Sequence, residues 1–177
     1  FFLHEKKTEQ LLALLAQGQL DILLIPWLDE MDTFERYDLF KEPLVIAASP
    51  LHTLAKKEEL TLDDLRGKTI LSLEDGHCLR EQALGYCFTA GAQEDERFKA
   101  TSLETLRYMV ACCNTGLTLL PKLATLNLAS KQNIRYKEFV EPQPFRQISL
   151  VIRDGYSRMA CVREIVSTIK QCINDVL

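Results

Sequence analysis

Short apolar runs rich in strand-forming residues alternate with helical patterns along this chain. The apolar runs occupy residues 20–26, 44–49 and 69–74, and helical patterns occupy residues 8–19 and 101–113. Such alternation is typical of βαβ units, in which a helix carries the chain back to begin a parallel strand. The pattern therefore predicts an α/β fold with a largely parallel sheet.

Capping signals mark the starts of several predicted helices. Thr8 stands where the first helix needs an N-cap, because its hydroxyl can accept a hydrogen bond from a backbone N–H. Thr61 with Asp64, and Thr101 with Glu104, have the spacing of a capping box. These signals predict helices that begin close to each of the three threonines.

The second half of the chain continues the alternation. Strands are predicted at residues 97–100, 116–120 and 148–153, and Pro121 is expected to begin another helix. A long amphipathic helix is predicted from about Ser157 to the end of the chain. Its apolar face would consist of Val162, Ile165, Val166, Ile169, Ile173 and Val176.

These elements can be drawn as two Rossmann-like lobes joined by two crossovers. Lobe I would comprise residues 1–44 and 148–177, and lobe II residues 45–147. The chain would leave the first lobe through "EPLVIAA" and return through "RQISLVI". Ligands of such folds usually bind beyond the carboxyl ends of strands or between lobes. The stretch "LSLEDGHC" forms the end of one such strand.

The composition excludes several classes of function. With 177 residues, 47% of them hydrophobic, the chain can bury its core without disulfides. Its 21 basic and 25 acidic residues are mixed without a basic block, so the chain itself is not expected to bind nucleic acid. No apolar run is long enough to cross a membrane, and no signal peptide accompanies the six cysteines, which indicates a reducing, cytoplasmic setting. The opening "FFLHE" lacks an initiator methionine, so we expect a fragment of a longer protein.

The stretch "LEDGHCLREQALGYCF" combines a strand-to-helix turn with two cysteines. Gly76 can take backbone angles that other residues avoid, which places Cys78 near the start of the following helix. Unpaired amides and the positive end of the helix dipole favour a thiolate there, and His77 and Arg80 can add positive charge. Cys78 is therefore a candidate peroxide-reactive thiol, and Cys87 can convert the sulfenic acid into a disulfide.

The spacing of the two cysteines restricts this hypothesis. Nine residues of α-helix separate two Cα atoms by about 13–14 Å, whereas a disulfide needs about 4.4–6.8 Å. A bond between Cys78 and Cys87 therefore requires the segment between them to unwind, so oxidation would act as a conformational switch. Gly85 lowers the cost of unwinding by about 1 kcal/mol relative to alanine.

Simpler interpretations of the cysteines stay open. Free cysteine is among the most often buried residue types, so Cys78 and Cys87 are equally open to a packing role. No metal site is expected, because a separation of nine residues matches no common zinc pairing. The other four lie on or beside apolar helix faces and are predicted to be mainly packing residues: Cys112, Cys113, Cys161 and Cys172.

The sequence resembles the regulatory domains of the OxyR peroxide sensors, a group within the LysR-type transcriptional regulators. The resemblance rests on "ILSLEDGHCLREQALGYCFTAGAQED", followed by "ATSLETLRYMVA" and "GLTLLP", and it covers essentially the whole chain. The motif "GHC", followed two residues later by an arginine and further on by a second cysteine, is specific to OxyR. The stretch "LLALLAQGQLDILLI" belongs instead to the scaffold shared by LysR-type proteins. The resemblance implies a fold like that of periplasmic binding proteins.

The resemblance also assigns roles to residues. It makes Cys78 the peroxidatic cysteine and Cys87 the resolving one, with His77 and Arg80 beside the reactive thiol. Thr8 matches a hydroxyl near the peroxide pocket, although a helix cap is an equally good interpretation.

Three charged residues gain further roles from the resemblance. Arg146 matches a basic residue near the reduced thiol, and Asp21 and Arg153 match positions associated with contact to RNA polymerase. Surface charges would explain the same three residues.

Two departures from the resemblance are visible. We find no counterpart in this sequence for the winged helix-turn-helix, the linker helix, or the first strand and helix of the regulatory domain. The turn "ACCNTGL" is longer and richer in cysteine than the usual turn of small residues.

The resemblance therefore predicts a redox-sensing domain rather than an enzyme. Hydrogen peroxide would oxidise Cys78, the disulfide with Cys87 would form, and an altered homodimer would reposition DNA-binding domains. The full-length protein would form dimers and tetramers, reach DNA and RNA polymerase, and be reset by thiol reductants, with no cofactor and no membrane.

Two alternatives remain: a LysR-type domain that binds a small organic effector with inert cysteines, and a thiol peroxidase. The latter would need the Pro/Thr/Cys loop of peroxiredoxins, which the chain lacks.

Overall fold

A computed structural model describes residues 2–28, 31–126 and 133–177. The helices are α1 (Thr8–Ala16), α2 (Cys78–Thr89), α3 (Leu103–Cys112) and α4 (Met159–Asn174), with short 3₁₀ turns η2 (Thr53–Lys56), η3 (Leu62–Leu65) and η4 (Lys122–Thr125). The strands are β1 (Ile22–Pro26), β2 (Glu35–Ala48), β3 (Thr69–Leu73), β4 (Gln93–Ala100), β5 (Leu117–Pro121), β6 (Arg135–Lys137) and β7 (Phe145–Ile152).

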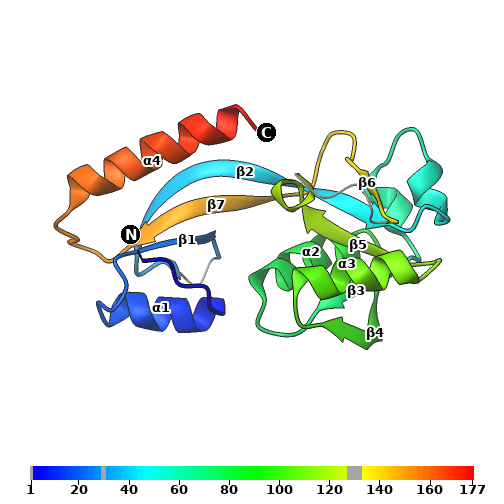
Figure 1. Cartoon of the computed structure of the whole chain (residues 1–177), viewed down its shortest axis with the longest axis horizontal. Helices are drawn as coiled ribbons and strands as arrows, with labels where there is room; N and C mark the ends of the chain where they lie inside the picture. Colours follow the sequence, from blue (N-terminus) through cyan, green and yellow to red (C-terminus); the bar gives the residue numbers. More distant parts are fainter. Residues whose placement is uncertain (1, 29–30, 127–132) are drawn as a thin grey trace. The chain divides into compact units, whose positions relative to one another are not determined.

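The chain divides into two compact units. Unit 1 contains Phe1–Glu42 and Arg146–Leu177, and unit 2 contains Pro43–Phe145. Both boundaries fall within strands, β2 on the way out of unit 1 and β7 on the way back, as the colours of Figure 1 allow the reader to follow.

Unit 1 is a sheet with a helix on each face. In Figure 1, α4 lies on one side of β2 and β7, and α1 lies on the other side of β1. Strand β7 can contact both helices because its successive side chains point to opposite faces of the sheet. Val151 packs with Leu11 and Leu15 of α1, whereas Leu150 packs with Val162 of α4.

The final helix follows the predicted amphipathic pattern closely but not completely. It begins at Met159 rather than Ser157 and ends at Asn174. Val162 is buried, and Ile165, Val166 and Ile169 pack against the same cluster. Val176 lies beyond the end of the helix and is exposed, so its predicted place on the apolar face is wrong.

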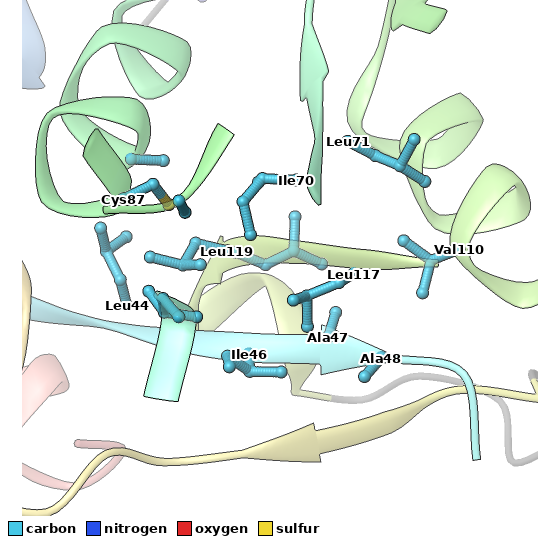
Figure 2. Packing of buried hydrophobic residues seen from close by; sticks show 14 of the residues in the cluster. Leu44, Ile46, Ala47, Ala48, Ile70, Leu71, Cys87, Val110, Leu117 and Leu119 are labelled. Carbon is cyan, nitrogen blue, oxygen red and sulfur yellow. The ribbon is translucent and has the colours of Figure 1, made fainter. Parts of the chain in front are cut away.

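Unit 2 contains the predicted βαβ unit. Strands β3 and β4 pair in parallel, and α2 connects them. Helices α2 and α3 both pack against β3 and β4, and α3 also packs against β5. The core of this unit includes Leu44 and Ile46 of β2 together with Leu119 of β5 (Figure 2).

The prediction of a largely parallel sheet is wrong. Strand β1 pairs antiparallel with β7, and β2 pairs antiparallel with both β5 and β6. Only the β3 and β4 pair is parallel among the pairings whose register is described. The predicted strand at 44–49 is the last part of the much longer β2, which connects the two units and so pairs with strands distant in sequence.

The capping predictions had mixed outcomes. The Asp64 carboxylate accepts a hydrogen bond from the Thr61 N–H at 2.9 Å, so that capping box is confirmed. Helix α1 begins at Thr8 itself, with Lys7 in the N-cap position, so Thr8 is not the cap. In α3 the cap is Ser102, whose hydroxyl accepts a hydrogen bond from the Thr105 N–H at 3.1 Å.

Pro121 does not begin an α-helix. It is the last residue of β5, and the short turn η4 follows it. Residues 127–132, where a longer helix would continue, lie outside the described part of the chain. Across the described ranges, no helix is both long enough and apolar enough to span a membrane.

Candidate functional site

The candidate site is the turn between β3 and α2. Strand β3 ends at Leu73, and Gly76 has a φ of 87°, a conformation that glycine takes at little cost. His77 occupies the N-cap position, and Cys78 is the first residue of α2. The prediction that Cys78 lies near the start of the helix is therefore confirmed.

The two cysteines of α2 have different surroundings. Both are free thiols, with Cys78 half-buried and Cys87 completely buried. Figure 2 shows Cys87 among the buried side chains that include Ile70 and Leu119. Burial raises the pKa of the Cys87 thiol to about 12, so this group stays protonated and unreactive while the helix is folded.

His77 and Arg80 are the two basic side chains next to Cys78 in sequence. The Nε2 atom of His77 is buried without a hydrogen-bond partner among the described residues and lies 3.9 Å from Oε1 of Glu74. Arg80 contacts two carboxylates, Glu94 at 2.7 Å and Asp75 at 3.2 Å. The positive charge of Arg80 is therefore offset by these carboxylates, and the start of α2 adds the positive end of its helix dipole near Cys78.

Arg80 is part of a larger polar cluster at the carboxyl end of β3. The hydroxyl of Ser72 donates a hydrogen bond to the Glu94 carboxylate, and Lys99 lies 3.5 Å from Asp75. Among these residues, only Arg80 was predicted from the sequence pattern, whereas Glu94 and Asp75 were missed. Asp75 was visible within the turn itself, whereas Glu94 comes from the far strand of the βαβ unit, so only the fold brings it to Arg80.

A small pocket lies under the buried face of α2. Its volume is about 10 Å³, and Leu79, Ala83 and Leu84 of α2 line it together with residues of β3, α3 and β5. This is about the size of one water molecule. An organic effector needs a pocket of about 300 Å³ or more, so this small pocket does not accommodate one. A wider hollow of about 620 Å³ lies along α2, where Gln82, Gly85 and Tyr86 line it, and it is large enough for a small organic molecule.

The other predicted site residues belong to unit 1. Thr8 is the first residue of α1, and the Arg146 Nε donates to Oε2 of the buried Glu42 at 2.7 Å. The Arg153 guanidinium donates to the Leu15 carbonyl at 2.9 Å and lies 4.0 Å from Asp21. Arg153 thus ties the end of α1 to the chain that follows β7, a structural contact beyond the simple surface charge that was the alternative.

The structure groups the predicted site residues of unit 2 on one helix. His77, Cys78 and Arg80 share the first turn of α2 in unit 2, and Cys87 lies further along the same helix. Thr8 and Arg146 belong to the other compact unit, unit 1.

The packing role predicted for the remaining cysteines is wrong. All four are exposed: Cys112, Cys113, Cys161 and Cys172. The helix patterns placed them beside apolar faces, but the core is filled by larger neighbours such as Val110 and Val162. Over the described residues, no group of three or more histidine, cysteine or acidic side chains is arranged to hold a metal ion.

Comparisons with known proteins give the site a family context. A relative from Haemophilus influenzae named "Hydrogen peroxide-inducible genes activator" is 41% identical over 176 residues, which cover 99% of this chain and 58% of the relative. This chain thus spans little more than half the length of that curated relative.

Solved structures agree with this relationship. The crystal structure of the oxidised form of OxyR has a TM-score of 0.84 and 42% identity, and the match covers 98% of this chain and 81% of that one. The reduced form of OxyR has the same TM-score of 0.84 with 39% identity, covering 96% of this chain and 79% of that one. The predicted resemblance to OxyR regulatory domains and their two-lobe fold is confirmed.

The family assignment follows from the sequence as a whole. The pattern of the LysR substrate binding domain matches residues 1–172 of the 177. The match includes the βαβ unit that carries the two cysteines, as well as the strands of unit 1. The chain belongs to the LysR substrate binding domain family.

Proposed function

We propose that this chain is the hydrogen peroxide-sensing regulatory domain of a LysR-type transcription activator. The observation that carries the proposal is the placement of two free thiols on α2, one half-buried at its first residue and one fully buried. The similarity to oxidised and reduced OxyR supports it. Cys78 is the proposed peroxidatic cysteine and Cys87 the proposed resolving cysteine.

The proposed chemistry takes place in two steps. The Cys78 thiolate attacks one peroxide oxygen, the O–O bond breaks, and hydroxide leaves, so Cys78 becomes a sulfenic acid. The Cys87 sulfur then attacks the Cys78 sulfur, and water leaves as the disulfide forms. Peroxide is reduced by two electrons, which the two thiols supply.

The second step requires α2 to unwind. The helix holds its first and tenth residues about 13–14 Å apart, well beyond the 4.4–6.8 Å Cα separation of a disulfide. Cys87 must also leave the apolar cluster, because its pKa of about 12 keeps it protonated there. Oxidation would therefore be coupled to a change of fold within unit 2.

The proposal extends to the two units and the remaining predicted residues. Unit 1 would correspond to regulatory lobe I and unit 2 to lobe II. Thr8 and Arg146 would contribute to the peroxide pocket, and Asp21 and Arg153 would contact RNA polymerase.

The whole protein would act as a sensor rather than an enzyme. It would form homodimers or tetramers in the cytoplasm, bind DNA through domains outside this chain, and be reset by thiol reductants. The sensor would be oxidised once per activation, whereas a thiol peroxidase would turn over many times.

The test is to treat the reduced protein with near-stoichiometric hydrogen peroxide and map disulfides by mass spectrometry. We expect one Cys78–Cys87 disulfide, formed together with a loss of helical circular dichroism. Cys78→Ser should block peroxide consumption, Cys87→Ser should stop at the sulfenic acid, and the exposed control Cys161→Ser should behave as wild type. If Cys78 and Cys87 remain unlinked in folded protein, the switch is wrong.

A further inference from the structure

Two adjacent exposed thiols lie where α3 ends. Cys112 is the last residue of the helix, and Cys113 follows it in the C-cap position with an extended backbone, φ −102° and ψ 122°. Both are free and exposed. The proposed peroxide chemistry uses neither of them, because it takes place on α2.

The backbone that carries this pair is well fixed. The Cys113 N–H donates to the Met109 carbonyl at 3.1 Å, and the Gly116 N–H donates to the Cys113 carbonyl at 2.9 Å. A Cβ atom at Gly116 would lie 2.7 Å from the carbonyl oxygen of Val110, so the turn packs tightly on the helix end. The two thiols are thus carried by a hydrogen-bonded turn packed against the helix end, which reduces the backbone entropy lost when both bind one ligand.

A direct disulfide between the two cysteines is unfavourable. Adjacent Cα atoms are about 3.8 Å apart across a trans peptide bond, which is shorter than the 4.4 Å minimum for an unstrained disulfide. The pair also lies at the negative end of the helix dipole, the opposite of the position of Cys78. Cys112 and Cys113 are therefore suited to stay as reduced thiols, and their adjacent positions let both sulfurs reach one bound atom.

A ligand atom inserted between the two sulfurs relieves the strain, because the ring that closes is one atom larger. Thiolate sulfurs prefer soft, thiophilic partners. A trivalent arsenical forms covalent bonds to two thiols and fits this arrangement. The third position on arsenic remains outside, toward solvent, since both cysteines are exposed.

We propose that Cys112 and Cys113 form a dithiol site for trivalent arsenicals. With an organoarsenic(III) oxide, two As–S bonds form, the arsenic–oxygen bond breaks, and the two thiol protons leave with the oxygen as water. No electrons are transferred, so no oxidant or reductant is needed. This reaction would give the domain a chemical input separate from the peroxide reaction.

The test uses phenylarsine oxide as the probe, at one equivalent on the reduced, folded protein. Intact-mass and peptide-level mass spectrometry follow the adduct in an excess of the monothiol glutathione and then in dithiothreitol. We expect one adduct on the peptide that contains residues 112 and 113, retained in glutathione and released by dithiothreitol.

Variants of each thiol decide the assignment. Cys112→Ser and Cys113→Ser should each retain the arsenical on the order of 100-fold more weakly, because the second bond is no longer intramolecular. The matched controls Cys161→Ser and Cys172→Ser remove exposed thiols of α4 and should retain it fully. Cys78→Ser should also retain it, which separates this site from the redox pair.

Three outcomes would overturn the proposal. They are the absence of a glutathione-resistant adduct on wild-type protein, full retention in both Cys112→Ser and Cys113→Ser, and transfer of the adduct to the Cys78 peptide. Circular dichroism of each variant shows that it is folded. Peroxide oxidation measured separately on Cys112→Ser reports on the proposed function, so the two proposals fail independently.

Discussion

Both carboxylate oxygens of Glu94 bind the Arg80 guanidinium, with Nη2 2.7 Å from Oε2 and 2.9 Å from Oε1. This ion pair connects the first turn of α2 to β4, and both side chains are largely buried, at 17% and 11% exposure. It holds the start of the helix whose unwinding the proposed switch requires. The pair therefore stabilises the helical form of the switch.

Glu94→Gln should weaken this form. The amide can still accept a hydrogen bond but leaves the partly buried Arg80 with Asp75 as its remaining carboxylate partner among the described residues. We therefore expect a loss of about 1–3 kcal/mol in the free energy of unfolding. The reduction potential of the Cys78–Cys87 couple should become more negative, because the reduced fold is destabilised. Urea unfolding and redox titration measure the two effects.

The matched control is Glu96→Gln, which makes the same change at an exposed position of β4. It should alter neither the unfolding free energy nor the potential. Equal behaviour of Glu94→Gln and Glu96→Gln would show that the ion pair does not restrain α2.

Gly85→Ala should act in the opposite direction. Gly85 is exposed within α2, and an added Cβ would meet no atom within 4 Å, so alanine gains its helix propensity without a clash. We expect a gain of about 0.5–1 kcal/mol in the reduced fold and a reduction potential about 10–20 mV less negative. Stopped-flow oxidation should also show slower disulfide formation.

Ser167→Ala provides the comparison for Gly85→Ala. It raises helix propensity at an exposed position of α4, in unit 1, and should stabilise the protein without changing the potential. A shift of the potential in both variants would mean that general stability, and not unwinding of α2, governs the couple.

The buried Cys87 thiol predicts a loss of stability in alkaline solution. Its pKa is about 12 in the folded protein and near 9.0 in the unfolded chain, so above pH 9 the unfolded state releases a proton that the folded state keeps. Stability should therefore fall as the pH rises from about 9, and less steeply in Cys87→Ala. Urea midpoints between about pH 8 and 10 measure this slope.

Alkylation tests the same burial kinetically. Iodoacetamide should modify the exposed cysteines of the native protein within the time in which Cys87 stays unmodified, and Cys87 should react once urea unfolds the protein. Equal rates at Cys87 and Cys161 in native protein would contradict the burial on which the proposed switch depends.

His52 predicts a second pH effect, on the acid side. Its Nδ1 accepts a hydrogen bond from the Leu54 N–H at 3.2 Å, and burial, followed by the charge of Lys68, lowers the pKa of the imidazole. Below about pH 6.5 the unfolded chain binds a proton that the folded protein does not, so stability should fall as the pH decreases.

His52→Asn keeps a hydrogen-bond acceptor at the cap and removes the titrating group. The variant should lose less stability than wild type between about pH 7 and 5, a window above that of the carboxylates, whose ordinary pKa lies near 4. Chemical unfolding at a series of pH values provides the comparison. Parallel curves for the two proteins would assign the pH effect to other groups.

Local sequence signals predicted the elements with a local cause. The capping box of Thr61 and Asp64, the start of α2 at Cys78 and the amphipathic α4 depend on residues within a few positions of each other. The antiparallel pairing of β2 with β5 and β6 was missed because it joins strands far apart in sequence. Helix periodicity likewise could not show that Cys113 is left outside α3 at its C-cap.

The sequence by itself determined the alternation of strands and helices, the turn that places Cys78 at the start of α2 and the resemblance to a peroxide-sensing family, since each rests on neighbouring residues. Only the tertiary structure decided that Glu94 binds Arg80 and that Cys87 is buried while Cys112 and Cys113 are exposed. The physical reason is that burial and ion pairing depend on which strands and helices meet across the core. The crossover from β3 through α2 to β4 brings Arg80 to Glu94, and no local pattern encodes the distance between these two side chains.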